Sequence, residues 1–144
     1  MYKHILIATD GSQLAGKAVT AGLLLAKHLG AKVTTVTVSE PLTGLAVGAP
    51  AFAFPIERYE EEAAESAARI LAEVSTAARE QGIDCTTLNA RGLAAEAIIE
   101  AAKAGACDLI VMASHGRRGL ARALLGSQAM RVLTLSHVPV LICR

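Results

Sequence analysis

Short apolar segments rich in β-branched residues alternate along this chain with longer segments of helical periodicity. The short segments predict strands and the longer ones predict helices. This alternation constrains the fold most, because strands separated by helices form a parallel sheet with helices on both faces and right-handed connections. The expected strands cover residues 3–9, 32–38, 84–89, 108–113 and 138–143, and the expected helices cover the segment between residues 12 and 30 and the segments 56–81, 94–104 and 127–136.

Several residues predict where these elements end. Ser12 is the expected N-cap of the first helix, because a serine hydroxyl can accept a hydrogen bond from a backbone N–H of the first turn. Gly30 and Gly82 are expected to close the first two helices. Pro139 is expected early in the last strand, where a missing N–H is best tolerated at the edge of a sheet.

Length and composition limit the class of protein. The 144 residues suit a single domain covering residues 1–144. Apolar residues make up 53% of the chain, but no run of about 18 of them occurs, so no membrane span is expected. Asp10, Lys17 and Lys27 interrupt the first apolar stretch, which argues against a signal peptide. The net charge of +1, spread without a basic stripe, argues against a nucleic-acid partner.

The cysteines indicate the compartment. Cys85, Cys107 and Cys143 are odd in number and far apart, and no C-x-x-C pair occurs. This pattern argues against a disulfide framework or a zinc site and favours a reducing compartment. We therefore expect a cytoplasmic protein whose cysteines are small buried hydrophobic residues.

Residues 39–55 form an expected loop of unusual length. Prolines and glycines interrupt it, yet it remains apolar, with Phe52 and Phe54 among its residues. Loops this long are uncommon and are often functional. We expect this loop to cover a ligand, a partner chain or the edge of the sheet.

Two loops carry the candidate chemistry, because ligands of open α/β sheets bind outside the carboxyl ends of the strands, where the strand order reverses. The first is the turn of residues 9–12, and the second runs from residue 113 to residue 127. In the second loop Gly116 allows a sharp turn beneath a ribose or phosphate, and Gly126 allows a ligand to approach the backbone. Ser127 opens a helix whose free N–H groups attract a phosphate. The alternative is a glycine turn followed by an ordinary serine N-cap.

Charged and titratable residues in these loops each have two interpretations. Asp10 could hold Mg²⁺, directly or through water, or accept backbone N–H groups within its turn, and the two roles are compatible. His115 could contact phosphate or transfer a proton, or it could be a structural histidine. Arg117, Arg118 and Arg122 could meet phosphates or an acidic partner, or remain solvated. No P-loop, G-x-G-x-x-G or nucleophile–base pair is present, so no catalytic residue is predicted.

Several motifs occur together and in a fixed order, and this combination is specific for one protein family. They are Ile-Leu-Ile-Ala-Thr-Asp-Gly-Ser at residues 5–12, Asp-Leu-Ile-Val-Met-Ala-Ser-His-Gly-Arg at 108–117 and Leu-Leu-Gly-Ser at 124–127, followed by Arg-Val-Leu at 131–133 and Pro-Val-Leu at 139–141. With these motifs the whole chain resembles the universal stress protein family. The resemblance implies a three-layer α/β/α, Rossmann-like fold, similar to the adenine nucleotide alpha hydrolases, with five parallel strands in the order 3-2-1-4-5.

The nucleotide-binding branch of this family carries a pattern of Gly, two residues, Gly, nine residues, Gly, then Ser or Thr. Gly116 and the pair Gly126-Ser127 match this pattern, whereas Ala113 replaces its first glycine. The added methyl group could crowd a ribose that relies on close approach of the backbone. An alanine would be strained by about 1–2 kcal/mol if the site required a left-handed backbone there, and would cost little if the backbone were extended. We expect nucleotide binding to be weaker but retained.

The resemblance also implies a ligand, a set of binding residues and an assembly. The ligand would be an adenine nucleotide, with ATP favoured over ADP or AMP. Mg²⁺ would be held by the nucleotide and by Asp10. Thr9 and Asp10 would lie beside the phosphates and ribose, Val38 would contact the base and Met112 would flank it. A homodimer would form through the last strand, from Val138 to Cys143, whose apolar edge would otherwise invite unwanted pairing. The implied nucleotide-binding residues are Ala8, Thr9, Asp10, Val38, Met112, Ala113, Ser114, His115, Gly116, Gly126, Ser127, Gln128 and Ala129.

Three functions are compatible with these residues and with the resemblance. The first is a nucleotide-binding stress or regulatory protein whose ligand alters its partner surface. The second is a dimeric interaction module that binds no nucleotide, for which Ala113 is the main support. The third is a slow ATPase with Mg²⁺ near Asp10, although no residue is evidently placed to activate water.

Overall fold

The computed structural model describes residues 1–41, 55–116 and 125–144, and strands and helices alternate through these segments. Residues 42–54 of the expected loop and the three arginines Arg117, Arg118 and Arg122 lie outside them. The elements are β1 (His4–Ala8), α1 (Gln13–Leu29), β2 (Lys32–Ser39), α2 (Ile56–Glu80), β3 (Cys85–Arg91), α3 (Ala94–Ala104), β4 (Leu109–Ala113), α4 (Ser127–Leu135) and β5 (Val140–Cys143).

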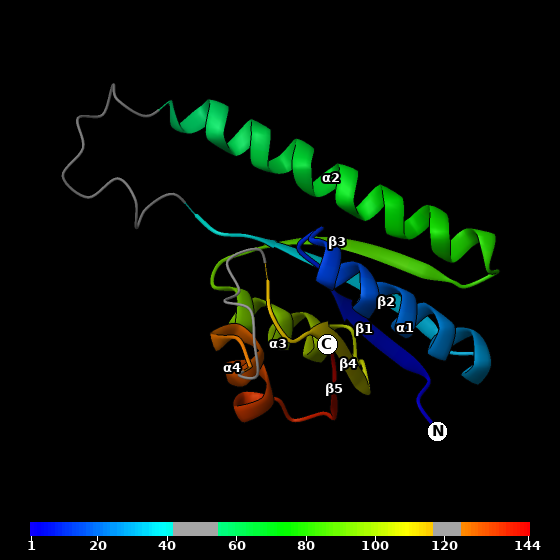
Figure 1. Cartoon of the computed structure of the whole chain (residues 1–144). Helices are drawn as coiled ribbons and strands as arrows, with labels where there is room; N and C mark the ends of the chain where they lie inside the picture. The colour runs from blue at the N-terminus through cyan, green and yellow to red at the C-terminus, as the bar shows by residue number, and fades with distance from the viewer. Residues whose placement is uncertain (42–54, 117–124) are drawn as a thin grey trace.

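The strands form one parallel sheet in the order β3-β2-β1-β4-β5, which confirms the expected fold class (Figure 1). β1 is the central strand, and its residues Ile5 and Ile7 pair with Leu109 and Val111 of β4. The chain runs outward from β1 through β2 to β3 and then returns to the other side of β1 at β4. The order therefore reverses between β1 and β4, so the loops that follow these two strands begin side by side.

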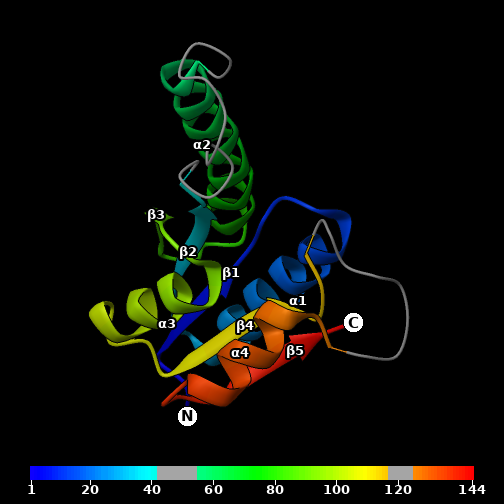
Figure 2. The same cartoon turned by 90° about the vertical axis from the view of Figure 1, so that its left-hand side faces the viewer.

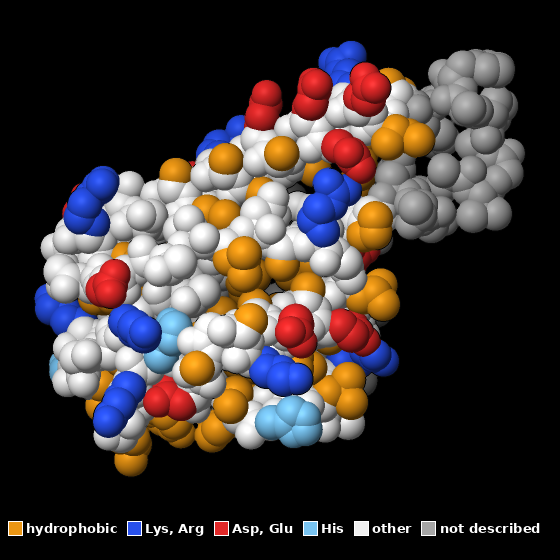
Figure 3. All heavy atoms as spheres, turned by 180° about the vertical axis from the view of Figure 1, so that it is seen from behind, with side chains coloured by type: hydrophobic (Ala, Val, Ile, Leu, Met, Phe, Trp, Pro, Cys, Tyr) orange, Lys and Arg blue, Asp and Glu red, His pale blue; other side chains and the backbone are white. Residues whose placement is uncertain are grey.

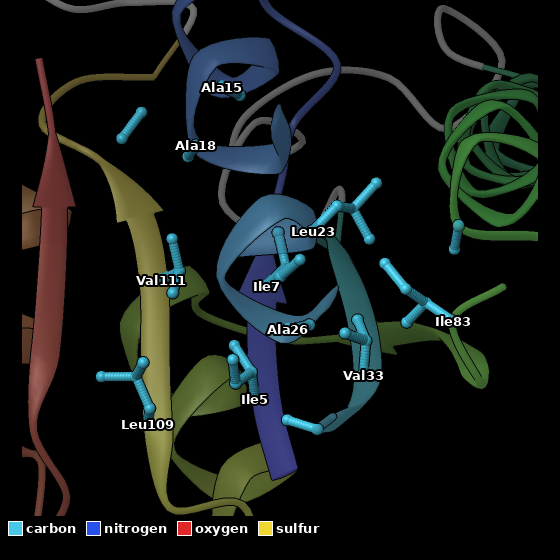
Figure 4. Close-up of a cluster of buried hydrophobic side chains, with 13 residues drawn as sticks. Ile5, Ile7, Ala15, Ala18, Leu23, Ala26, Val33, Ile83, Leu109 and Val111 are labelled. Atoms are coloured by element: carbon cyan, nitrogen blue, oxygen red, sulfur yellow. The ribbon is translucent and has the colours of Figure 1, made fainter. Parts of the chain in front are cut away.

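Two helices cover each face of the sheet (Figures 1 and 2). Residues alternate between the faces along each strand, as the pleat requires. In β1, Ile5 and Ile7 face α1, whereas Leu6 and Ala8 face α3 and α4. Figure 4 shows Ile5 and Ile7 beneath α1, close to its residues Leu23 and Ala26. The sheet thus separates two apolar cores, and the candidate loops lie at its end.

The predicted helix ends are confirmed. The Ser12 hydroxyl accepts a hydrogen bond from the backbone N–H of Ala15 at 3.2 Å. Gly30, with φ of 66°, ends α1 in the left-handed conformation, and Gly82, with φ of 71°, follows α2 in the same conformation. These conformations explain the two glycines, because other residues adopt them at a cost.

The start of the last strand differs from the expectation. β5 begins at Val140, so Val138 and Pro139 precede the strand. The Pro139 carbonyl nevertheless accepts a hydrogen bond from the backbone N–H of Ile110 at 3.0 Å. Pro139 therefore pairs with β4 through its backbone carbonyl alone, so its lack of an N–H group does not matter here. The prediction that β5 lies at an edge of the sheet is confirmed.

At the opposite end of the sheet from the candidate loops, Asp108 joins β1 to β4. Its carboxylate accepts hydrogen bonds from the backbone N–H groups of Lys3, at 2.8 Å, and His4, at 3.1 Å. Burial raises the pKa of Asp108, but the backbone N–H bonds outweigh it and hold the pKa below its usual value. The aspartate before β4 therefore has a structural role.

The described surface carries mixed charge. Lys and Arg side chains lie interspersed with Asp and Glu side chains on the face seen in Figure 3. Of the three cysteines expected to be buried, Cys107 is buried, whereas Cys85 and Cys143 are half-buried. Cys85, Cys107 and Cys143 are free, and burial raises the pKa of all three thiols. No helix in the described segments is long and apolar enough to span a membrane.

Candidate functional site

The turn after β1 is built by short side chains that bond to their own backbone. The Thr9 hydroxyl accepts from the N–H of Gly11 at 3.2 Å, and an Asp10 carboxylate oxygen accepts from the N–H of Ser12 at 2.9 Å. Gly11 has φ of 77°, which favours glycine. Asp10 therefore has the structural role that its position predicted, through one of its two carboxylate oxygens.

The other oxygen of Asp10, Oδ2, faces the loop that follows β4. A Cβ atom built on Gly116 would lie 2.8 Å from this oxygen, closer than side chains normally approach. The two loops predicted to share the site thus touch, and Gly116 permits the contact. This is the arrangement expected at a point where the strand order reverses.

The second loop closes back on β4 through its other glycine. The N–H of Gly126 donates to the carbonyl of Ser114 at 2.8 Å. A Cβ atom on Gly126 would lie 2.9 Å from this same carbonyl oxygen. Gly126 therefore contacts the backbone of Ser114 directly. Because glycine has no Cβ atom, the start of α4 can lie against the end of β4.

Helix α4 begins at Ser127, as expected. Gly126, with φ of −61° and ψ of 155°, is the N-cap of α4, and no side chain caps this end. Ser127 is the first helical residue and is exposed. The alternative of an ordinary serine N-cap is therefore wrong. The Ser127 side chain stands on the surface beside the positive end of the helix dipole.

Gln128 has a structural partner that its position in the sequence did not reveal. Its side-chain oxygen accepts a hydrogen bond from the backbone N–H of Ala95 at 3.1 Å. Leu93, the N-cap of α3, makes no side-chain capping bond, so Gln128 supplies one from a different helix. The expectation that Gln128 surrounds a phosphate requires this bond to open or the ligand to reach the amide from outside.

Burial divides the expected site residues into two groups. One group is less than a tenth exposed, so these residues could meet a ligand mainly through their backbone. It comprises Ala8, Thr9, Met112, Ala113, Ser114 and Ala129. The other group is half-buried or exposed and offers its surface to a ligand. It comprises Asp10, Val38, His115, Gly116, Gly126, Ser127 and Gln128.

Ala113 is accommodated without strain. It is the last residue of β4 and pairs with Cys143 of β5. Its backbone lies outside the left-handed region, and its methyl group belongs to the apolar core beneath α1. Of the two backbone conformations considered for this position, the extended one is present, so the alanine adds little strain energy. The replacement of the motif's first glycine therefore introduces no backbone strain.

His115 lies at the junction of β4 and α4. Its Nδ1 atom is 3.0 Å from the Ser114 hydroxyl oxygen. Its Cδ2 atom would lie 3.5 Å from a Cβ atom on Gly126, so one edge of the ring lies beside the start of α4. No sequence pattern indicated the Ser114 partner, because neighbouring residues in an extended chain usually point apart.

A small pocket that no sequence motif indicated lies between α2 and the carboxyl ends of β2 and β3. Two of its charged residues, Arg91 and Glu60, form an ion pair at 2.9 Å. The Ser39 hydroxyl donates to the Asn89 side-chain oxygen at 3.1 Å. The pocket is lined by Ser39, Glu40, Tyr59, Glu60, Ala63, Ala64, Asn89 and Arg91.

Known proteins are similar to this chain in sequence and in fold. The chain matches the universal stress protein family over residues 1–144. It belongs to that family. Universal stress protein MJ0531 of Methanocaldococcus jannaschii is 36% identical over 146 residues, which cover 100% of this chain and 83% of the relative. The family resemblance is thereby confirmed.

Solved structures of universal stress proteins share the fold over nearly the whole chain. The structure of protein MJ0577 of the same organism has a TM-score of 0.85 at 26% identity and covers 99% of this chain and 96% of its own. A universal stress protein solved in complex with cAMP has a TM-score of 0.75 at 25% identity, covering 99% and 97%.

Proposed function

We propose that this universal stress protein binds an adenine nucleotide between the loops that follow β1 and β4, and that ATP is its preferred ligand over ADP or AMP. The main support is the contact of these loops, in which the Asp10 carboxylate oxygen Oδ2 would lie 2.8 Å from a Cβ atom on Gly116. The related universal stress protein in complex with cAMP supports the choice of an adenine nucleotide. Such a ligand and three free thiols suit the cytoplasm.

The described residues suggest how the nucleotide would lie. The start of α4 offers backbone N–H groups that have no partner within the helix and the positive end of a helix dipole, which suits the phosphates. The exposed Ser127 hydroxyl lies in this first turn. Val38, half-buried near the end of β2, would contact the base. The nucleotide would thus span the carboxyl ends of three neighbouring strands, β2, β1 and β4.

Magnesium fits the site as an ion held largely by the nucleotide. Among the described residues no group of three His, Cys, Asp or Glu side chains could hold a metal ion. Asp10 offers a carboxylate where the two loops meet. Mg²⁺ is commonly bound by one or two carboxylates together with substrate phosphates and water. When bound, the ion would neutralise phosphate charge.

The nucleotide site is tested by adding a negative charge at Ser127. Wild type at an ATP concentration of 100 times the dissociation constant should gain about 2.7 kcal/mol in unfolding free energy. Ser127→Glu should bind ATP at least about fivefold more weakly, because unit charges about 4 Å apart repel by about 1–4 kcal/mol. Its nucleotide-free stability should not fall, because an acidic residue is favourable in a first helical turn. Titration calorimetry and thermal unfolding measure both quantities.

The matched control is Thr76→Glu, which places the same charge on an exposed position of α2. It should bind ATP like wild type. If Ser127→Glu also binds like wild type, the phosphates lie elsewhere. If wild type binds no ATP, ADP or AMP, the protein is better described as an interaction module.

We also propose that the protein forms a homodimer through β5. Leu141 of this edge strand is 41% exposed, and Met130 and Leu133 of α4 are 50% and 40% exposed. An exposed apolar edge strand readily pairs with another chain. Leu141→Lys should convert the dimer to a monomer, as measured by light scattering at micromolar concentrations. Leu88→Lys, at an equally exposed leucine on the opposite edge strand β3, should leave the dimer intact. A monomeric wild type would contradict this assembly.

The proposal is binding rather than hydrolysis. Asp10 and His115 are the titratable side chains among the described residues of the site, and each has a structural partner, the N–H of Ser12 and the hydroxyl of Ser114. A hydrolase needs a group within reach of an attacking water in addition to a bound nucleotide. A nucleotide-regulated partner surface therefore fits this site better than turnover does.

A further inference from the structure

Ser114 is held on two sides at the junction of the proposed dimer strand and the proposed phosphate site. Its N–H donates to the carbonyl of Cys143 in β5, and its carbonyl accepts from the N–H of Gly126, both at 2.8 Å. The residue is 4% exposed. These bonds fix the backbone of Ser114, and its hydroxyl lies 3.0 Å from Nδ1 of His115.

This contact has a consequence for the imidazole. A neutral histidine carries one N–H, and the other ring nitrogen is an acceptor. If the Ser114 hydroxyl donates to Nδ1, the proton of the ring resides on Nε2. The Cδ2 atom, which is bonded to Nε2, lies at the edge of the ring that faces Gly126. The donor is then on the side of the ring where α4 begins.

We propose that Ser114 is a positioning residue that holds His115 in the Nε2–H tautomer, so that Nε2–H donates to a phosphate oxygen of the bound nucleotide. The inference rests on the proposed function and extends it. It makes His115 a residue that selects phosphorylated ligands over nucleosides, because adenosine lacks the acceptor. The buried Ser114 hydroxyl acts through His115 and does not itself touch the ligand.

Four variants test this role by titration calorimetry with ATP and with adenosine. His115→Asn removes the donor at the Nε2 position and should weaken ATP binding about tenfold, the usual size for a hydrogen bond to a charged group. His115→Gln places an amide N–H near that position and should stay within about threefold of wild type. Ser114→Ala should weaken ATP binding about three- to tenfold. Ser75→Ala, the same change on α2, should have no effect, and all four should bind adenosine within about twofold of wild type.

A spectroscopic measurement tests the tautomer without ligand. Nitrogen-15 chemical shifts of the His115 ring, recorded at about pH 8.5 above the ordinary titration range of histidine, should show the Nε2–H tautomer in nucleotide-free wild type. Ser114→Ala should show a mixture of tautomers. A purely structural serine would alter stability but leave the tautomer and the ratio of ATP to adenosine affinity unchanged.

The outcomes separate this inference from the proposed function. If wild type binds ATP and adenosine but Ser114→Ala changes neither the tautomer nor the ATP affinity, the positioning role is overturned and nucleotide binding stands. An Nδ1–H tautomer in wild type also overturns the positioning role. If wild type binds neither ligand, the proposed function fails, and the phosphate role of His115 fails with it.

Discussion

Replacing Gly22 by valine should lower the free energy of unfolding by about 3 kcal/mol, at the upper end of the usual cost of overpacking a core. Gly22 lies in the middle of α1 and is buried. A Cβ atom there would lie 2.6 Å from Cδ1 and 2.8 Å from Cγ1 of Ile7, a residue with no exposed surface. The helix therefore touches β1 at the position of the glycine, and any side chain must displace Ile7.

The smaller change Gly22→Ala tests whether the gain in helix propensity or the close contact with Ile7 has the larger effect on stability. Alanine is better than glycine in a helix interior by about 1 kcal/mol. The contact with Ile7 costs about 1–3 kcal/mol, so we expect a net loss of stability. Gly16→Ala is the matched control in the same helix, because no atom lies within 4 Å of a Cβ there, and it should be stabilising. Urea denaturation measures all three variants.

A double variant checks the cause. Adding Ile7→Val to Gly22→Ala removes the Cδ1 atom that lies nearest the new methyl group. The double variant should be more stable than the sum of the two single changes predicts, because residues in contact are not additive. If Gly22→Ala instead stabilises the protein as Gly16→Ala does, α1 does not approach β1 as closely as these distances require.

The sequence predicted the elements well because their signals are local. Apolar runs, helical periodicity and caps such as Ser12 and Gly30 depend on neighbouring residues, and the structure has them where they were expected. The strand order is different in kind, since it depends on which strands pair across the sheet. It was implied by the family resemblance rather than by any residue pattern. The contact of Gly22 with Ile7 likewise depends on packing between elements and is revealed only by the structure.

The candidate site was predicted in outline and not in its contacts. The rule that ligands bind where the strand order reverses selected the two loops, and the contact between Asp10 and Gly116 joins them. Gln128 shows the limit of this rule, because its partner Ala95 is 33 residues away in the chain and belongs to another helix. Ser127 was correctly expected to open α4, but the sequence left open whether its side chain caps the helix, and the structure shows that Gly126 is the N-cap.

The two matched glycines of the family pattern are expected to respond differently to alanine. Gly126→Ala should lower the free energy of unfolding by about 1–3 kcal/mol and weaken ATP binding at least about tenfold. The backbone conformation at Gly126 suits alanine, with φ of −61° and ψ of 155°. The cost arises from the Ser114 carbonyl, which is backbone and would lie 2.9 Å from the new methyl group. Relief of this contact requires the start of α4 to move away from β4.

Gly116→Ala should cost less stability, below about 1 kcal/mol, because the neighbouring atom is the Asp10 carboxylate, a side chain that can rotate. Its effect should appear instead in the Mg²⁺ dependence of ATP binding, since Asp10 is the proposed carboxylate ligand. Thermal unfolding and calorimetry with and without Mg²⁺ distinguish the two variants. Equal losses of stability would mean that the Asp10 side chain is as rigid as the backbone of Ser114. Unchanged ATP affinity in Gly126→Ala would place the phosphates away from α4, because the variant must displace the first turn that is proposed to hold them.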